Sequence, residues 1–432
     1  MRRRKFMMNS GILLGSAMAL PASLSAFSDA TNPPLNSDSW ESVRSQFDIN
    51  HDHIQMAQML LASHPTPVRE AINKHRKGFD ESPAEYWEEH WLEQEALVTK
   101  EAARYMNAGV GEIALTDSTT QGLAMLYNGL KLKAGDEIVT TTHDHYVTEM
   151  SLHYASEKNG AVIKRIDEYA DASKLTIDEV VSNITKAISD KTRIVAVTWV
   201  QSCTGVKLPI RAIADSIREI NSKRDKRIYF CVDGVHGFGN QDEDIPALGC
   251  DFFCAGTHKW IFGPRGTGLV WARKNAWDMV APTIPAFRWN PFVKWLEQPL
   301  EGEMTFGDLF SPGGFHAYDH RWSLDTAFQF QMEIGRSRIH QRTSAMSTAV
   351  KEAIGEMSHV QLITPIDTEL SAGINCFRVK GLTADEVVKK FHEKGVIASA
   401  SPYQDSVPRL TPCVINTEEE VVKSLKVLNE IN

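Results

Sequence analysis

Short apolar runs alternate with longer amphipathic stretches along most of the chain from about residue 60. The apolar runs predict strands, at residues 138–142, 161–166, 194–200, 228–233, 252–255 and 268–272. Helical periodicity fills the intervals, for example at 120–130, after Ser118, and at 209–220. Apolar strands separated by helices of about ten or more residues are typical of a mainly parallel sheet covered on both faces. The pattern therefore predicts an α/β fold.

The pattern changes after about residue 290. A segment rich in Trp, Pro and Gly (289–322) leads into a long helical stretch at 323–357, a strand at 373–379, a helix at 383–394 and a closing helix from Thr417. This order predicts a second, smaller α+β domain. We expect an arm or linker at 31–60, a large domain at 61–290 and a small C-terminal domain at 291–432.

The first thirty residues have the composition of an export signal. A basic start, Arg2 to Lys5, precedes an apolar stretch at 11–27 that Gly, Ser and Pro interrupt. This stretch is shorter than the roughly 20 apolar residues of a membrane span, and many of its residues are small. Arg3-Arg4-Lys5-Phe6 resembles a twin-arginine signal, and an ordinary secretory signal or an uncleaved anchor is the alternative. We expect the twin-arginine machinery to deliver a periplasmic or exported protein with no stable membrane anchor.

Composition and charge narrow the class of protein. The 432 residues are 42% hydrophobic and 23% charged, which suits a globular chain with a sizeable core. Lys and Arg number 46 against 55 Asp and Glu, a net charge of −9, so we expect no nucleic-acid partner. The six cysteines fit no zinc ribbon and are interpreted as buried thiols. His51-Asp-His53 and His143-Asp-His145 have a metal-like spacing without a clear third ligand, so we assign no metal.

A small, hydroxyl-rich turn precedes the predicted helix at 120–130. Its sequence is Thr116-Asp-Ser-Thr-Thr-Gln-Gly122. Unpaired backbone amides at a helix N-terminus, together with hydroxyl side chains, bind anions such as phosphate. An ordinary Ser or Thr N-cap explains the same residues when they are taken alone.

An acid and an amine follow two later strands. Asp233 ends the strand at 228–233 and is followed by glycines, and Lys259 comes just after the strand at 252–255. The spacing of 26 positions leaves room for one helix and one strand, so both side chains are expected at the same edge of neighbouring strands. An acid, an amine and a phosphate cradle at one sheet edge indicate a pyridoxal phosphate site, with Lys259 as Schiff base and Asp233 as partner of the pyridinium nitrogen.

These segments resemble a known family. Val-Asp-Gly-Val-His-Gly-Phe-Gly, which contains Asp233, and Gly-Thr-His-Lys-Trp, which contains Lys259, are similar to segments of the class V aminotransferases, which have the pyridoxal-phosphate-dependent fold type I. They are most similar to its isopenicillin N epimerase-like branch. The resemblance covers about residues 55–430. It implies a large domain with a mainly parallel sheet, a smaller α+β domain and a homodimer.

The resemblance also implies roles around the coenzyme. Lys259 matches the Schiff-base lysine, Asp233 the pyridinium partner, and His145 the ring that stacks on the pyridine. The remaining matches are residues placed around the coenzyme's phosphate, phenolic oxygen and ring: Thr119 and Thr120 (phosphate loop), His258 (phosphate side), His236 (phenolic oxygen) and Ser202, or alternatively Gln201 (near the ring).

Arg409, in Pro-Arg-Leu-Thr-Pro, matches the arginine that holds the substrate's α-carboxylate, a task that suits its planar, bidentate donors. We therefore expect an enzyme acting at Cα of an amino acid or derivative, of epimerase or aminotransferase type. A carbon–sulfur β-lyase is the alternative within this chemistry, and a non-catalytic exported binding protein is the alternative outside it.

Two departures from the family pattern matter. Cysteine desulfurases of this family carry a cysteine on the loop before the carboxylate arginine, whereas residues 395–409 contain none, so we do not expect persulfide chemistry. The family's dimers often send a Gly-Thr segment to the partner's phosphate. The corresponding segment, 311–321, lacks that threonine.

Overall fold

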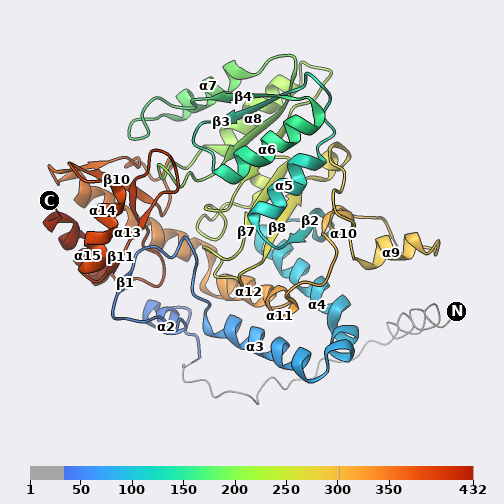
Figure 1. The fold of residues 1–432 in the computed structure, drawn as a ribbon, viewed down its shortest axis with the longest axis horizontal. Coiled ribbons are helices and arrows are strands. Elements are labelled where there is room, and N and C mark those ends of the chain that lie inside the picture. Colours follow the sequence, from blue (N-terminus) through green and yellow to red (C-terminus); the bar gives the residue numbers. More distant parts are fainter. Residues whose placement is uncertain (1–33, 301, 432) are drawn as a thin grey trace. The chain divides into compact units, whose positions relative to one another are not determined.

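The computed structural model describes residues 34–300 and 302–431. The predictions for residues 1–30 therefore lie outside the described residues. Leu35–Asn432 forms one compact unit, drawn in Figure 1. Within the part of the chain that is described, no helix combines the length and the apolar character needed to cross a membrane.

A seven-stranded sheet forms the centre of the larger part of the molecule. Its strand order is β2-β8-β7-β6-β5-β3-β4, and β8 runs antiparallel to both of its neighbours while the other pairs are parallel. The strands are β2 (Ile113–Thr116), β3 (Glu137–Thr141), β4 (Val162–Ile166), β5 (Thr192–Thr198), β6 (Tyr229–Asp233), β7 (Phe252–Gly256) and β8 (Gly268–Ala272). The predicted α/β fold with a mainly parallel sheet is confirmed.

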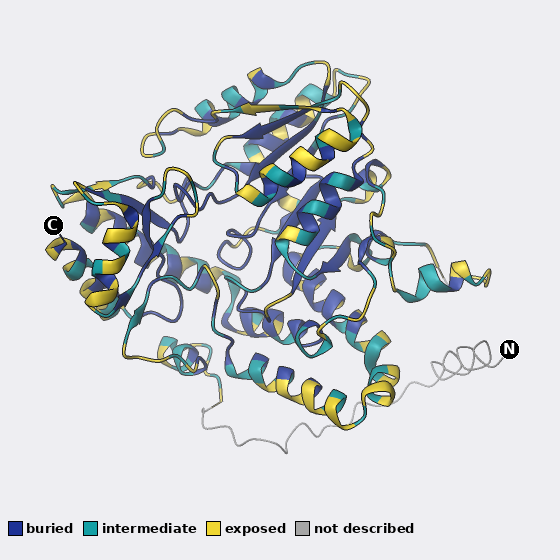
Figure 2. Ribbon diagram, in the orientation of Figure 1, coloured by how far each residue is buried: buried dark blue, intermediate teal, exposed yellow. Residues whose placement is uncertain are grey.

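Alternate residues of these strands pack against two different helical layers. Val195 and Val197 face a core that includes α7 (Ile177–Ala187) and α8 (Ile210–Asn221), whereas Ile194 and Ala196 face one with α5 (Thr119–Gly129) and α6 (Tyr146–Asn159). Successive side chains of a strand point to opposite faces, so a sheet buried on both faces has apolar residues at every position. Figure 2 accordingly shows its central strands as buried.

A second, antiparallel sheet lies in the C-terminal part of the chain. Its order is β12-β13-β10-β9, from β9 (Val360–Leu362), β10 (Asn375–Val379), β12 (Ser399–Ala400) and β13 (Pro408–Leu410). It is joined by α13 (Arg336–Gly355), α14 (Ala384–Glu393) and α15 (Glu418–Glu430). The single helical stretch expected at 323–357 is two helices, α12 (Leu324–Ile334) and α13. They are separated by Gly335, whose φ of 94° breaks the helix.

The remaining elements are short or peripheral. The expected arm holds α2 (Trp40–Ser45) and β1 (Ile54–Gln55), and β1 pairs with β11 (Val396–Ile397). Two longer helices follow, α3 (Thr66–Glu81) and α4 (Pro83–Met106). The other elements are α9 (Trp289–Trp295), α10 (Phe306–Phe310), α11 (Tyr318–Arg321) and three 3-10 turns, η2 (Val110–Glu112), η3 (Ile245–Leu248) and η4 (Lys274–Met279).

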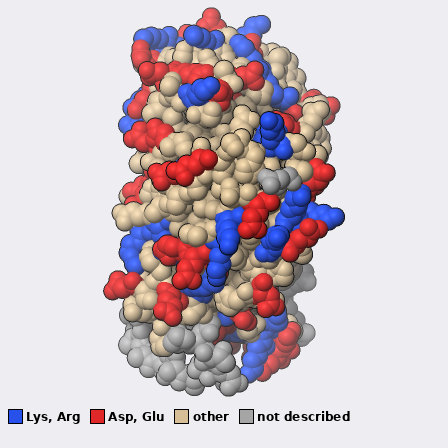
Figure 3. Space-filling view, turned by 90° about the vertical axis from the view of Figure 1, so that its left-hand side faces the viewer, with Lys and Arg blue, Asp and Glu red and all other residues tan. Residues whose placement is uncertain are grey.

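Most predicted strands agree with the structure within two residues. The sequence pattern missed β2, because its four residues, although all buried, are too few to stand out between two helices. All six cysteines are buried and free, as predicted. The face of the molecule drawn in Figure 3 carries acidic and basic side chains intermixed, without a large patch of one sign.

Candidate active site

A cavity of about 130 Å³ lies at the carboxyl ends of the parallel strands. It brings together all eight residues predicted to surround the coenzyme, Thr119, Thr120, His145, Ser202, Asp233, His236, His258 and Lys259. Five more residues line it, Ser118, Val147, Thr198, Val235 and Tyr403. Arg409 is not among the lining residues and lies behind Ser202, whose carbonyl accepts a hydrogen bond from Arg409 Nη1 at 2.9 Å.

Asp233 and Lys259 meet because their strands are neighbours. Asp233 is the last residue of β6 and is in register with Cys254 of β7, and Lys259 lies three residues beyond the end of β7. Burial lowers the pKa of Lys259 to about 8; the carboxylate of Asp233 opposes this shift and the Arg409 guanidinium adds to it. About a tenth of the Lys259 amine is therefore neutral, and nucleophilic, at pH 7, far more than for a lysine with an ordinary pKa.

Asp233 is 2% exposed and has few partners for a buried carboxylate. Its oxygens accept hydrogen bonds from Thr148 Oγ1 at 3.2 Å and from the Val235 amide at 3.1 Å. Burial raises its pKa to about 6, while the Val235 amide and the charge of Lys259 act in the opposite direction. A cationic group beside this carboxylate would favour its ionised form, and a protonated ring nitrogen is such a group.

The His236 ring lies between Lys259 and Trp260 and contacts both. Its Nε2 lies 3.1 Å from Lys259 Nζ, and its Nδ1 accepts a hydrogen bond from Trp260 Nε1 at 3.4 Å. Because an indole nitrogen only donates, Nδ1 is the acceptor, and the proton of the neutral imidazole is on Nε2, toward the cavity. Burial and the Lys259 charge hold the pKa of His236 well below its usual value, so the ring is neutral.

His145 is held in place by its sequence neighbour. His145 is the N-cap of α6, and its Nδ1 accepts from the Val147 amide at 3.3 Å. The preceding residue, Asp144, is buried and accepts hydrogen bonds from Thr140 and Thr141 of β3 and from Thr198 of β5. This carboxylate ties the ends of two strands together and sets the position at which the His145 ring enters the cavity.

The opposite end of the cavity suits a phosphate. Ser118 caps α5 by accepting from the Gln121 amide at 3.1 Å, and the buried Thr119 Oγ1 has no hydrogen-bond partner. A Cβ on Gly256 would lie 2.7 Å from that Thr119 oxygen and 3.0 Å from the His258 ring, so only glycine leaves this space open. An orphaned hydroxyl, a helix N-terminus and a glycine cradle together fit the phosphate of a coenzyme.

His258 borders the same end of the cavity. Burial lowers its pKa to about 4, with further lowering by Lys259 and Arg265. The ring is therefore neutral at physiological pH and acts through hydrogen bonding rather than through charge.

The end of the cavity beside Ser202 is called the substrate end, because Arg409, the residue predicted to bind a substrate carboxylate, lies behind Ser202. It contains one residue that the sequence pattern did not indicate. Tyr403 lies on the loop between β12 and β13, its hydroxyl is 3.0 Å from Ser202 Oγ, and its ring contacts His145 edge-on at 6.0 Å. Burial holds the pKa of Tyr403 well above its usual value. Its only sequence signal is its place six residues before Arg409, in a loop of otherwise small or polar residues.

Arg409 is 1% exposed and firmly bound within the chain. Besides the bond to the Ser202 carbonyl, Nε donates to Ser399 Oγ at 3.2 Å and Nη2 to the Ala400 carbonyl at 2.8 Å. A guanidinium has five N–H groups, and these hydrogen bonds use three of them.

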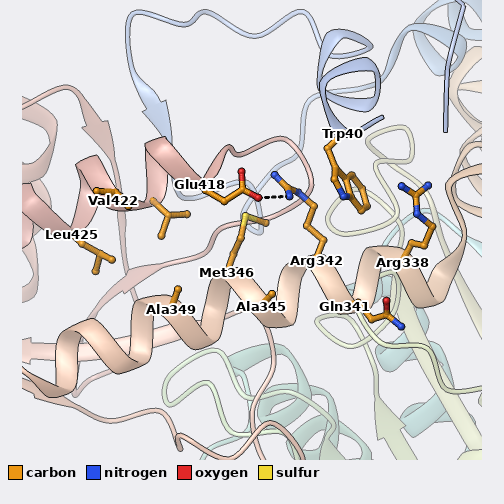
Figure 4. Close-up of a pocket in the computed structure, with 11 residues that line it drawn as sticks. Trp40, Arg338, Gln341, Arg342, Ala345, Met346, Ala349, Glu418, Val422 and Leu425 are labelled. Atoms are coloured by element: carbon orange, nitrogen blue, oxygen red, sulfur yellow. Dashed lines mark hydrogen bonds and ion pairs between the residues drawn. The ribbon is translucent and has the colours of Figure 1, made fainter. Parts of the chain in front are cut away.

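Two other pockets are separate from this cavity. His143 pairs with Glu168 at 2.9 Å and lines a polar pocket with Tyr169, so the His143/His145 pair is not a joint ligand set. A groove of about 450 Å³ runs between α13 and α15 beside Trp40, where Arg342 pairs with Glu418 at 2.7 Å (Figure 4). Neither pocket contains an amine and an acid at adjoining strand ends.

The fold and the cavity define the class of protein: an α/β protein of the pyridoxal-phosphate-dependent fold type I, with a lysine and an aspartate at adjacent strand ends. The family model "Aminotransferase class-V" matches residues 90–403, and the chain belongs to this family. The family consists of pyridoxal-phosphate-dependent enzymes, and the predicted cofactor and enzyme class are confirmed.

Among curated relatives, the isopenicillin N epimerase of Streptomyces clavuligerus is 24% identical over 348 residues, 77% of this chain and 81% of the relative. A probable cysteine desulfurase of Xylella fastidiosa strain 9a5c is 23% identical over 393 residues, 84% and 86% of the two chains. A solved structure of a C-DES mutant with glycine covalently linked to pyridoxal phosphate superposes with a TM-score of 0.80. That match has 21% identity and covers 90% of this chain and 99% of the other.

Proposed function

We propose that the chain acts at the α-carbon of an amino acid or amino-acid derivative, as an epimerase or an aminotransferase. The observation that carries this proposal is the shared cavity of Lys259 and Asp233, with the pKa of the Lys259 amine lowered and His236 directly beside it. An isopenicillin N epimerase among the relatives supports the epimerase type.

Each side chain has a distinct task in this proposal. Lys259 Nζ would hold the coenzyme covalently, Asp233 would keep a proton on its ring nitrogen, and His236 would donate from Nε2 to its phenolic oxygen. His145 and Ser202 would lie beside its ring. Thr119, Thr120 and His258 bind its phosphate. Arg409 receives the α-carboxylate of the substrate with its two remaining N–H groups.

Bound pyridoxal phosphate draws electrons from the substrate's α-carbon and thereby acidifies the α-proton. Lys259 Nζ, which lines the cavity, would be the base that takes this proton. An epimerase returns a proton to the other face of the α-carbon. An aminotransferase yields a keto acid and passes the amino group to a second keto acid, and a β-lyase yields a keto acid, ammonia and the released β-substituent.

The first experiment tests the covalent site itself. Borohydride treatment of the purified holoprotein, followed by peptide mass mapping, is expected to fix the coenzyme on Lys259 and on no other lysine. Lys259→Ala should lack the visible absorbance of the linked coenzyme, whereas the exposed Lys274→Ala should retain it. A colourless wild-type protein that cannot be reconstituted would instead favour the non-catalytic binding protein.

A second experiment separates the reaction types. The holoprotein is incubated with an amino-acid panel, and its products are assayed by chiral chromatography, a keto-acid assay and a thiol assay. An inverted stereocentre or a keto acid without released thiol supports the proposal. Pyruvate released together with a thiol or sulfide would replace it with the carbon–sulfur β-lyase.

One observation keeps the β-lyase as a second candidate while arguing against a persulfide carried on an enzyme cysteine. No cysteine belongs to the described residues that line the cavity, and Cys376 and Cys413 are 0% and 1% exposed. A persulfide-forming desulfurase needs a thiolate at the substrate, whereas β-elimination needs only the base and the coenzyme.

We also propose that the protein acts as a homodimer. Exposed aromatic rings support this proposal: Phe315 is 79% and Phe287 is 41% exposed, and their centroids lie 6.2 Å apart beside Trp87. Contiguous exposed apolar surface marks interaction sites. Light scattering should give a dimer for the wild type and a larger monomer fraction for Phe315→Glu. A wild-type monomer at micromolar concentration would contradict the proposal.

Export by the twin-arginine route, and a periplasmic location, complete the proposal. This route transports folded proteins, so the coenzyme can be bound before transport. A reporter fused to residues 1–30 should leave the cytoplasm only in cells that have the twin-arginine translocase. Export that continues without this translocase would indicate an ordinary secretory signal.

A further inference from the structure

The segment Ser311–Arg321 packs against the phosphate loop of its own chain. Ser311 Oγ accepts from the Leu115 amide at 3.1 Å, at the end of β2. His316 Nδ1 lies 2.9 Å from Asp117 Oδ1, and Arg321 Nη1 lies 3.5 Å from the same oxygen. The segment that the family resemblance would direct toward a partner's phosphate therefore contacts the loop at Thr116–Thr120 from within the same chain.

Arg321, the arginine of this contact, is held in the protein interior. Arg321, 4% exposed, donates from Nε and Nη2 to Glu95 of α4 at 2.7 and 3.3 Å, and Arg288 pairs with the same carboxylate at 3.2 Å. Burial raises the pKa of Glu95, but the two guanidinium groups outweigh that effect and its pKa is lowered. The ionised Glu95 carboxylate thus holds Arg321 in place, and Arg321 has little freedom to move away from Asp117.

His316 connects two acceptors. Its Nε2 lies 3.2 Å from the carbonyl oxygen of Pro312, and its Nδ1 faces the Asp117 carboxylate. Both partners accept hydrogen bonds, so the ring bridges them fully only when both nitrogens carry protons. His316 and Arg321 also lower the pKa of Asp117, although burial, the largest single influence, acts in the opposite direction. The Asp117 carboxylate is therefore ionised and lies between the His316 ring and the Arg321 guanidinium.

Asp117 in turn fixes the N-terminal turn of α5. Its amide donates to Gln121 Oε1 at 2.7 Å, and Gln121 Nε2 donates back to its carboxylate at 3.4 Å. Ser118 and Thr119 follow directly, so the same contacts determine where the orphaned Thr119 hydroxyl and the first amides of the helix point. Binding donors that are held in place before the ligand arrives bind it more tightly, because less freedom is lost on binding.

We propose that Asp117, His316 and Arg321 form a positioning set that holds the phosphate loop ready for the coenzyme's phosphate in cis. None of the three lines the cavity, so they act through the loop rather than on the coenzyme. The inference rests on the proposed coenzyme site. It adds that residues of the same chain, and not of a partner subunit, hold the phosphate loop in position.

The test compares two ligands that differ only in the phosphate. Apoprotein is titrated with pyridoxal phosphate and with pyridoxal, and binding is followed by tryptophan fluorescence. His316→Ala is expected to raise the dissociation constant for pyridoxal phosphate about tenfold, the loss expected for one charge-assisted hydrogen bond. The dissociation constant for pyridoxal should stay within about twofold. Equal weakening of both ligands, or no weakening of either, would overturn the proposal.

Controls separate loop positioning from other causes. His320 lies on α11, four residues after His316, and its ring contacts the Arg265 carbonyl; His320→Ala should bind pyridoxal phosphate like the wild type. His316→Gln restores a donor and should recover part of the affinity. If His316→Ala does not fold, as judged by circular dichroism and thermal melting, the His316→Gln and Asp117→Asn variants provide the same comparison.

A double mutant decides whether His316 acts through Asp117. Asp117→Asn should also weaken pyridoxal phosphate binding, and the double variant should be no weaker than the weaker single variant. Additive losses would mean that His316 acts on the phosphate directly and not through Asp117. Tighter binding by Asp117→Asn would mean that the Asp117 carboxylate only repels the phosphate. Either result contradicts the proposal. If the wild-type apoprotein binds neither ligand, the proposed function fails, and not only the positioning.

Discussion

The two ends of the cavity are built in different ways. The phosphate end is made by the β2–α5 turn and the end of β7, and buried ion pairs from α4 and α11 brace it. The substrate end is closed by the loop between β12 and β13, which places Tyr403 against Ser202. That loop is exposed at Gln404 and Asp405. We therefore expect coenzyme binding and substrate choice to depend on separate segments, which mutations should be able to damage one at a time.

Lys259→Ala should have the largest effect because it damages both functions. We expect turnover of the best amino-acid substrate to fall on the order of 10⁴-fold, since the covalent link and the proton-transferring base are lost together. The measurement is turnover at saturating coenzyme, with Lys274→Ala as control. If Lys259→Ala turns over at a tenth of the wild-type rate, another residue must be the base.

Arg409→Lys should damage the substrate end alone. We expect substrate affinity to fall about 10²-fold and coenzyme affinity to change by less than about threefold, because a lysine cannot bind a carboxylate bidentately. Spectral titration with substrate and fluorescence titration of the apoprotein measure the two affinities. Equal losses in both would mean that Arg409 mainly supports the fold through Ser202 and Ala400.

The pH dependence of coenzyme capture should reveal the state of Lys259. Its lowered pKa, about 8, means that the neutral amine accumulates at a lower pH than for an ordinary lysine. Because the neutral amine is the nucleophile, capture of pyridoxal phosphate by the apoprotein should accelerate about tenfold between about pH 7 and pH 9 and then level off. Stopped-flow absorbance measures this rate. A rate that still rises steeply above pH 9 would show an unshifted amine.

Tyr403→Phe should have the smallest effect, again at the substrate end. Loss of the hydroxyl bond to Ser202 is expected to weaken amino-acid binding about fivefold and to leave coenzyme affinity unchanged, since one neutral hydrogen bond is worth about 1 kcal/mol. Tyr154→Phe, at an exposed tyrosine of α6, is the matched control. A loss of coenzyme affinity in Tyr403→Phe would show that the two ends are coupled.

The sequence pattern predicted the phosphate end better than the substrate end. Thr119, Asp233 and Lys259 each follow a strand or open a helix, and the carboxyl ends of parallel strands meet at one edge, so local pattern was enough to group them. Tyr403 lies on an irregular loop with no such rule. Its position depends on how the second sheet packs beside Ser202, about two hundred residues earlier in the chain.

The sequence by itself determined the α/β class, the strand ends that carry the acid and the amine, and the glycine-rich turns beside them, because these depend on the local periodicity of apolar residues. Only the tertiary structure decided that Asp117 is held by His316 and Arg321, that Arg409 lies behind Ser202, and that Gly335 divides one long helical pattern. These contacts join residues that are far apart in the chain, or depend on a single backbone angle. Their energies come from burial and charge pairing, which exist only once the chain has folded.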